Sequence, residues 1–161
     1  AEVASKGPIT AMKVVALKTT IASSLANISV NIPSPAATGI TMCFQNAANE
    51  NSSTANCNKL EYVNVDSIQY LFNSANSYLS YKLDNKSEMI RRAIASFSAD
   101  PSHDKYQVSP EDLMAGRNFF LGSDLDGIMD LSQNTFDIQI QSDIAGVQHN
   151  VYLFAHTLAQ L

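Results

Sequence analysis

Alternation of apolar and polar residues with a period of two is the dominant pattern along the chain, and it predicts strands. In the clearest case, Thr135–Gln141, the residues Phe136, Ile138 and Ile140 share one face and polar residues occupy the other. Asn27–Ile32 repeats the arrangement before a proline ends it. The same pattern predicts further strands over Met12–Thr20, Thr38–Gln45, Leu60–Phe72, Tyr78–Leu83, Phe119–Leu125 and Gln148–Leu158.

Two of these strands depart from simple alternation. In Leu60–Phe72 the apolar positions change phase at Asp66 and Ser67, which predicts a bulge or a corner. The last strand carries large apolar residues on both faces through Val151–Phe154. We therefore expect it to be a central strand, or one that packs against a neighbouring subunit.

Two short helices are predicted between the strands. Asp84–Phe97 carries apolar residues on one helical face, with Asp84 as the expected N-cap and with Arg91 and Arg92 directed outward. Ser109–Gly116 begins with a serine, a proline and two acidic residues, which is typical of a helix start, and predicts a second helix of one or two turns.

Eight short strands with few helices predict an all-β fold, an antiparallel β-sandwich. The strand number favours an eight-stranded jelly roll with one or two short helices in the loops, built as a single domain over residues 1–161. An immunoglobulin-like sandwich is the alternative, and the absence of tryptophan weakens it.

The charge of the chain narrows the range of partners. Ten basic and 15 acidic residues give a net charge of −5, the wrong sign for direct nucleic-acid binding through phosphates. No apolar run is long enough for a transmembrane segment. Only 16% of the residues are charged, and 19 Ser and 14 Asn supply much of the polarity.

The sequence contains two cysteines, and their pattern allows either a disulfide between them or free thiols. Cys43 lies in an apolar run, whereas Cys57 lies in the polar loop Asn46–Asn58. A bridge between them is one alternative, and a buried structural thiol at Cys43 is the one that the pattern favours.

Candidate chemistry is sparse. Asp124, Asp126 and Asp130 form the densest acidic cluster, which predicts a strand end that runs into an Asp-Gly turn, with a weak metal site as the alternative. The calcium-loop pattern fails there, because Gly122 and Gln133 occupy positions that need acidic ligands.

The histidines do not indicate a catalytic or metal site. Ser102–Asp104, a consecutive Ser-His-Asp run around His103, cannot form a triad in an extended segment. His149 and His156 are seven residues apart on one predicted strand and thus face opposite sides. We find no motif for a nucleophile, a phosphate loop or a metal helix, and predict no catalytic, cofactor-binding or metal residues and no enzyme activity.

The tyrosines support an alternative function. Exposed aromatic rings can stack on sugars, and a carbohydrate-binding, lectin-like β-sandwich would use such a platform. Its candidate residues are Tyr62, Tyr70, Tyr78 and Tyr81. At alternate strand positions, tyrosines more often fill a core or cover a subunit interface.

Asn27–Gln45 reads as a strand, a proline turn and a strand. This segment resembles the opening of the second, C-terminal jelly roll in the major capsid proteins of the double-jelly-roll lineage, found in virophages and Polinton-like viruses. The likeness continues through Leu60–Tyr70, Tyr78–Asp84, Phe119–Asp126, Phe136–Ile140 and Val151–Ala155. The family joins two jelly rolls in one chain, whereas this chain has the length of one.

The resemblance implies a structural viral protein, a jelly-roll building block of a capsomer in an icosahedral capsid. Implied partners are copies of this chain or a companion jelly-roll chain, in a trimeric or pseudo-hexameric capsomer, and no cofactor is implied. The implied location is the virion, assembled inside the host cell. We expect contacts between subunits through the Asn46–Asn58 loop, the Asp84–Phe97 helix and the Ser98–Gln107 segment.

Overall fold

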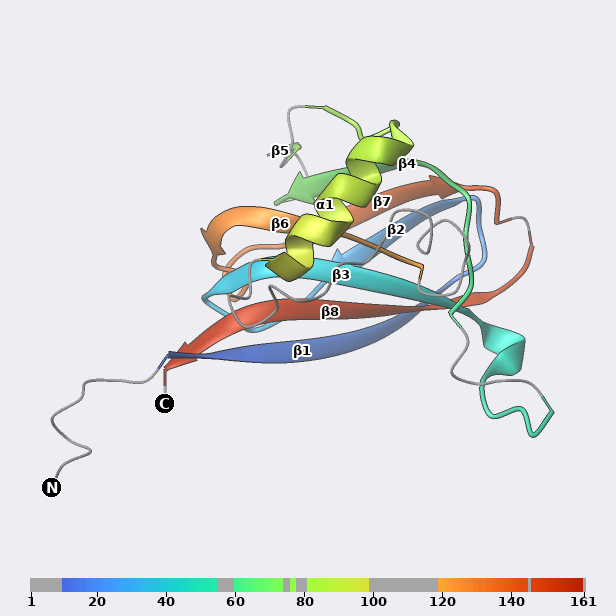
Figure 1. The fold of residues 1–161 in the computed structure, drawn as a ribbon, viewed down its shortest axis with the longest axis horizontal. Helices are drawn as coiled ribbons and strands as arrows, with labels where there is room; N and C mark the ends of the chain where they lie inside the picture. Colours follow the sequence, from blue (N-terminus) through green and yellow to red (C-terminus); the bar gives the residue numbers. More distant parts are fainter. Residues whose placement is uncertain are drawn as a thin grey trace, which may run out of the picture.

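Two antiparallel sheets face each other, and one helix lies against the first of them (Figure 1). The computed structural model describes residues 10–54, 60–73, 76–77, 81–98, 119–144 and 146–160. Its strands are β1 (Thr10–Ile21), β2 (Leu25–Val30), β3 (Ala37–Asn46), β4 (Val65–Phe72), β5 (Asn76–Ser77), β6 (Phe120–Met129), β7 (Phe136–Ser142) and β8 (His149–Gln160). The helix is α1 (Lys86–Ser98), and a 3-10 turn, Ala47–Asn49, follows β3.

The strands pair in a nested order. Sheet A has the order β1-β8-β3-β6 and sheet B the order β2-β7-β4-β5. The first strand thus pairs with the last, the second with the seventh, the third with the sixth and the fourth with the fifth, all antiparallel. The fold is therefore an all-β sandwich, as the alternation predicted, with seven strands of six or more residues and the two-residue β5.

Alternate residues of both sheets fill the space between them. Ile40, Met42 and Phe44 of β3 face Ile138 and its neighbours on β7, all with 2% or less of their surface exposed. Because side chains alternate along a strand, the residues between these positions face outward. The predicted inward faces of Asn27–Ile32 and Thr135–Gln141 are confirmed by the buried side chains Ile28, Val30, Ile32, Phe136, Ile138 and Ile140.

Helix α1 packs across β6 and β3 on the outer face of sheet A (Figure 1). Its residue Met89 joins the main core, while Ala93 packs against Phe120. The close approach requires glycine on the sheet: a Cβ at Gly122 would lie 2.5 Å from the Ile40 carbonyl oxygen and 2.8 Å from Ser96 Oγ. Strand β3 is consequently covered on both faces.

The start of the helix differs from the prediction by one residue. Asn85, not Asp84, is the N-cap, because its side-chain oxygen accepts a hydrogen bond from the Ser87 backbone N–H at 2.9 Å. Both residue types cap helices well, so the pattern alone did not separate them. The predicted helix at Ser109–Gly116 lies outside the described residues.

Strand boundaries differ where the backbone is irregular. The strand expected over Leu60–Phe72 begins at Val65, and its register shifts between Val65 and Ser67, which confirms the predicted bulge. Of the strand expected over Tyr78–Leu83, residues 78–80 lie outside the described part, and Leu83 forms an isolated bridge with Ile68. Strand β8 is central, between β1 and β3, as its two apolar faces predicted.

The acidic segment of β6 does not end the strand, contrary to the prediction. Asp126 and Gly127 have φ values of 44° and 140°, and residues 125–128 stand opposite the single residue Thr38. The strand resumes its pairing at Met129 with Ala37. The Asp-Gly pair therefore forms a bulge within a longer strand, because glycine tolerates positive φ.

Among the described residues, no helix is both long and apolar enough to cross a membrane.

The tight contact at Gly122 gives a stability prediction. We expect Gly122→Ala to lower the free energy of unfolding by about 1–3 kcal/mol, because its methyl group would overlap backbone and Ser96 atoms. Urea unfolding followed by circular dichroism measures the change. Ala22→Val, an enlargement at an exposed position between β1 and β2, is the control and should leave stability nearly unchanged. Equal stability of Gly122→Ala and the wild type would contradict this packing.

Candidate functional site

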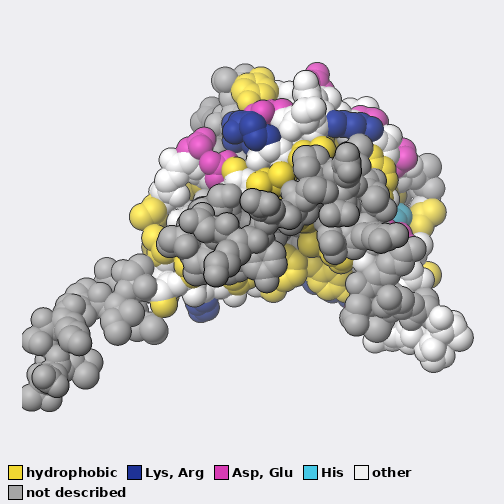
Figure 2. All heavy atoms as spheres, viewed as in Figure 1, with side chains coloured by type: hydrophobic (Ala, Val, Ile, Leu, Met, Phe, Trp, Pro, Cys, Tyr) yellow, Lys and Arg dark blue, Asp and Glu magenta, His cyan; other side chains and the backbone are white. Residues whose placement is uncertain are grey.

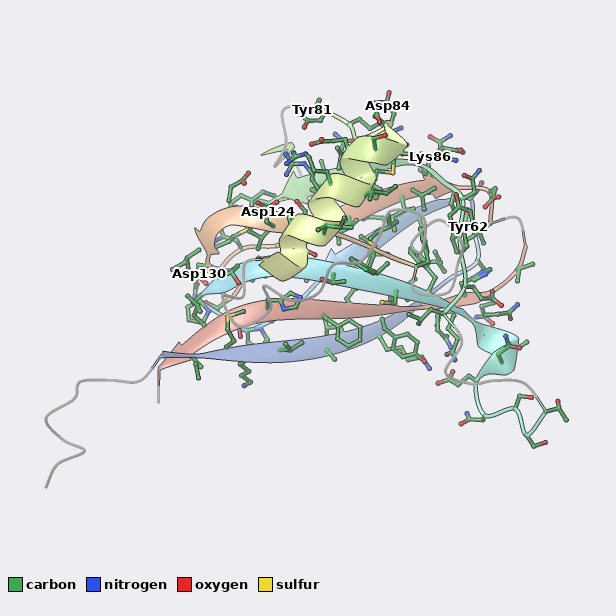
Figure 3. All side chains as sticks on the ribbon, viewed as in Figure 1. Tyr62, Tyr81, Asp84, Lys86, Asp124 and Asp130 are labelled. Carbon is green, nitrogen blue, oxygen red and sulfur yellow. The ribbon has the colours of Figure 1, made fainter. Side chains whose placement is uncertain are left out.

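The described residues hold no group of three or more His, Cys, Asp or Glu side chains arranged to bind a metal ion. Figure 3 shows Asp124 of β6 beside α1 and Asp130 farther away, just past the end of that strand. Asp130 accepts hydrogen bonds from the Ser132 backbone and side chain, which lowers the pKa of its carboxyl group. The weak metal site considered for Asp124, Asp126 and Asp130 therefore gains no support from geometry.

The two described histidines serve different structural contacts. His149 lies within hydrogen-bonding distance of the Val147 carbonyl oxygen through Nδ1 and within 3.3 Å of Glu61 through Nε2. On the opposite face of β8, His156 Nε2 lies 3.1 Å from Thr41 Oγ1, which in turn contacts Ser96 of α1. They do not share a site, and His103 with its neighbours in Ser102–Asp104 lies outside the described residues.

The tyrosines do not form one platform. Tyr70 is 1% exposed, and burial raises the pKa of its hydroxyl, so the prediction that it could stack on a sugar is wrong. Tyr62 packs edge-on against Phe119, whereas Tyr81 binds Glu88 through its hydroxyl, and Figure 3 shows the two on different sides of α1. Tyr78 lies outside the described residues.

Cys43 has a free thiol on the outer face of sheet A, next to α1. Burial raises the pKa of this thiol to about 11, which keeps it protonated and unreactive at neutral pH. This matches the interpretation of Cys43 as a structural thiol. Cys57 lies outside the described residues.

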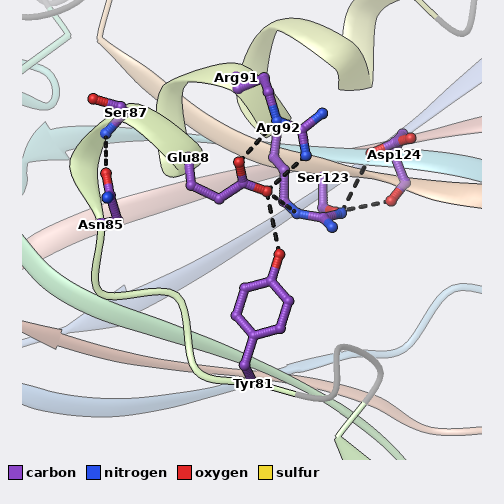
Figure 4. Close-up of polar contacts among 8 residues, drawn as sticks. All are labelled: Tyr81, Asn85, Ser87, Glu88, Arg91, Arg92, Ser123 and Asp124. Carbon is purple, nitrogen blue, oxygen red and sulfur yellow. Dashed lines mark hydrogen bonds and ion pairs between the residues drawn. The ribbon is translucent and has the colours of Figure 1, made fainter.

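A charged cluster fastens α1 to β6 (Figure 4). Glu88 accepts hydrogen bonds from Arg91 at 2.6 Å and from Arg92 at 3.1 Å. Arg92 also reaches Ser123 of β6 at 3.4 Å and lies 3.7 Å from the Asp124 carboxylate. The prediction that Arg92 points outward is wrong: its side chain is 10% exposed, against 65% for Arg91.

Two carboxyl groups of this region are shifted in opposite directions. Hydrogen bonding by Arg91 lowers the pKa of Glu88 to about 2. Burial and the neighbouring Asp126 raise the pKa of Asp124, and Arg92 only partly offsets that effect. Arg92 therefore neutralises two carboxylates at the junction of helix and sheet, which is a structural role.

The loop after β3 is held against sheet A. Lys18 of β1 pairs with Glu50, and Asn150 of β8 donates a hydrogen bond to the same carboxylate at 2.8 Å. Lys18 lowers the pKa of Glu50. Glu50 therefore ties the first part of the predicted contact loop Asn46–Asn58 to sheet A, and residues 55–58 lie outside the described part.

An apolar area that the pattern analysis missed lies beside this loop. We call it the β1–β8 surface: Val14 and Ala16 of β1 with Tyr152 and Phe154 of β8. Val14 is 52% exposed, Ala16 is exposed, and the two aromatic residues are half-buried. Figure 2 shows charged side chains gathered over α1 and hydrophobic ones over β1 and β8.

The sequence contained a signal for this surface. Met12–Thr20 carries apolar residues on both faces, at Val14 and Ala16 as well as at Val15 and Leu17. As in the last strand, apolar residues on both faces indicate that neither face is fully solvated. Of the other predicted contact segments, the helix turns charged residues outward, and Ser98–Gln107 lies outside the described part beyond Ser98.

No family model matches the sequence, and no curated protein matches it. Function is therefore inferred from the fold and its surfaces.

Substitution of the two neighbouring arginines tests whether the charged cluster stabilises the contact between α1 and β6. We expect Arg92→Met to lower the free energy of unfolding by about 2 kcal/mol, because it leaves Asp124 half-buried without its cation. Arg91→Met is the matched comparison: its pair with Glu88 is exposed and screened by solvent, so this variant should lose much less stability than Arg92→Met. Urea unfolding of both variants measures the two losses of stability. Equal losses would show that Arg92 does not link α1 to β6.

The shifted carboxyl groups predict a pH dependence. Glu88 has a folded-state pKa below that of an unfolded glutamate, so its stabilising effect is present above about pH 4.5 and disappears as the pH falls toward 2. We expect Glu88→Gln to flatten the loss of stability over this interval, measured by urea unfolding at a series of pH values.

Asp124→Asn should have the opposite effect on the pH dependence of stability. The raised pKa of Asp124 means that its protonated form favours folding at low pH, an effect that is lost as the pH rises through the folded-state pKa. The variant should therefore lose relatively more stability than the wild type on acidification. Identical pH profiles for wild type and both variants would contradict the cluster's electrostatics.

Proposed function

We propose that the sandwich is a jelly roll. A jelly roll consists of eight antiparallel strands in two four-stranded sheets, connected as Greek keys. The sheet orders β1-β8-β3-β6 and β2-β7-β4-β5 support this assignment, because the nested pairs lie alternately in the two sheets. An immunoglobulin-like sandwich does not pair its strands in this nested way.

We propose that the chain is a structural capsid protein, a jelly-roll building block that acts by self-association. The observation that supports the proposal is the partly exposed apolar β1–β8 surface on the outer face of a nested sandwich. The segments that resemble the capsid family fall on β2 and β3, on β4, and on β6, β7 and β8. Their order along the chain supports the proposal.

The charges on β1 indicate how copies would meet. β1 is an edge strand whose described partner is β8 alone, so its outer backbone groups are available. Lys13 and Lys18 lie on this strand, and lysine on an edge opposes the addition of another strand. We therefore infer that subunits pack side chains of the β1–β8 surface against one another rather than extend sheet A.

The partners in this proposal are copies of the chain or a companion jelly-roll chain, in a trimeric or pseudo-hexameric capsomer. The net charge of −5 disfavours contact with a genome. The place of action would be the virion.

Association can be tested at Val14. We expect the wild type to form oligomers in light scattering and regular trimers or hexamers in electron microscopy. Val14→Asp should weaken association at least tenfold, since a buried, unpaired carboxylate costs more than about 1.4 kcal/mol. Ile128→Asp, at a 65% exposed position on the β6 bulge, is the matched control.

A wild type that stays monomeric at every concentration would contradict self-association. Equal weakening by both aspartate variants would contradict the assignment of the interface to the β1–β8 surface.

A further inference from the structure

The two edges of sheet A carry opposite charges. Strand β1, at one edge, contains Lys13 and Lys18 and no acidic residue. The other edge, which we call the acidic β6 edge, contains Asp124, Asp126 and Asp130 and no basic residue. We propose that the β1 edge of one copy packs against the acidic β6 edge of the next copy, head to tail. This inference rests on the proposed function and names the surface of the neighbouring copy that faces β1.

A trimeric or hexameric ring requires two different surfaces on each copy. A surface that meets only its own counterpart forms a two-fold pair and ends at a dimer, whereas head-to-tail contacts close into a ring. Lys13 and Lys18 also oppose a contact of β1 with β1 of another copy, because like charges would face each other. The acidic β6 edge is the oppositely charged counterpart on the same sheet.

The opposite charges lie at the same level of the sheet. The pairings of β1 with β8, β8 with β3 and β3 with β6 place Val14 in one row with Asp124. The next row joins Lys13 to Met129, and the bulge that contains Asp126 lies between these two rows. In a ring whose axis runs along the strands, neighbouring copies are related by rotation without a shift along that axis. Groups at the same level on the two edges therefore meet.

Lys13 supplies an unpaired positive charge on the β1 edge. It is exposed and forms no ion pair with the residues that the structure describes, whereas Lys18 is paired with Glu50. Val14 is 52% exposed beside it. A partner at this edge would therefore gain an ion pair together with apolar contact.

The acidic β6 edge has an excess of carboxylates. Arg92 lies 3.7 Å from the Asp124 carboxylate, but it also binds Glu88. Burial and the neighbouring Asp126 keep the pKa of Asp124 above its ordinary value in spite of this arginine. A lysine from a neighbouring copy would offset the surplus negative charge.

Both edges favour contact through side chains over the addition of a strand. Lysine on an edge strand hinders strand addition, and so does a bulge. The bulge at Asp126 and Gly127 interrupts the pairing geometry of β6. The proposed contact therefore joins charges of the two edges without extending sheet A.

Reversal of the charge on β1 tests the contact by sedimentation velocity at low ionic strength, where charge contacts are strongest. Lys13→Glu should weaken association at least about tenfold, because the glutamate would face the carboxylates of the next copy. Lys82→Glu is the matched control, since it changes the net charge equally but lies 3.3 Å from Gln141 on sheet B. Association of the control should change little, and added salt should reduce the effect of Lys13→Glu.

Reversal on the other edge tests whether the two edges face each other. Asp126→Lys should weaken association by a similar factor. Asp126→Lys and Lys13→Glu in one chain should restore association to within about threefold of the wild type, because opposite charges meet again in exchanged positions. Circular dichroism verifies that each variant is folded.

A second pair of variants makes the same test without a change in the residues of the bulge. Ile128→Lys places a positive charge at an exposed position between Asp126 and Asp130 and should weaken association. Ile128→Asp removes the same apolar side chain but adds a carboxylate that faces the lysine, so the two effects offset each other. The difference between these variants therefore measures the charge contact alone.

Association of Lys13→Glu equal to that of the wild type would overturn the inference. So would a combined variant that stays as weak as its single parents, or an assembly that ends at a dimer. A wild type that is monomeric at every concentration would overturn the inference together with the proposed function. Trimers or hexamers that none of the charge reversals weakens would overturn this inference alone.

Discussion

The structure depends on the burial of alternate side chains between two sheets that neither half of the chain can form alone. Strand β1 pairs with β8, and β2 pairs with β7, so the inward residues of each sheet come from both ends of the sequence. Each fully buried Ile, Leu or Phe contributes roughly 1.5–3 kcal/mol, whereas an isolated strand pair is marginally stable. The core therefore forms only when the distant strands have met.

Helix α1 makes the two halves of the outer face of sheet A unequal. It covers β6 and β3, where Gly122 allows the close approach and Arg92 neutralises the carboxylates of Glu88 and Asp124. The other half of the same face, at β1 and β8, keeps an edge strand and apolar side chains at the surface. This asymmetry is why we place the proposed subunit contact on the β1–β8 surface.

The functional surfaces were less predictable than the fold, for reasons that individual residues make clear. Arg92 was predicted to point outward because helical periodicity gives only the position of a side chain around the helix axis. Whether that side of the helix is exposed to solvent depends on where β6 packs. The charges of β1 and of the acidic β6 edge are visible in the sequence, but no local pattern places Lys13 at the level of the bulge in β6. That placement depends on the pairing of β8 with β1 and β3, and of β3 with β6.

The period-two pattern by itself determined the all-β class, most strand positions, the bulge in β4 and the central place of β8, because alternation reflects local backbone geometry. It also indicated α1 through a different period. Tertiary structure alone decided which strands are neighbours, that Arg92 is buried against β6 and that the acidic segment of β6 forms a bulge within the strand instead of ending it. These outcomes depend on contacts between residues far apart in the chain, and no local pattern of side chains records them.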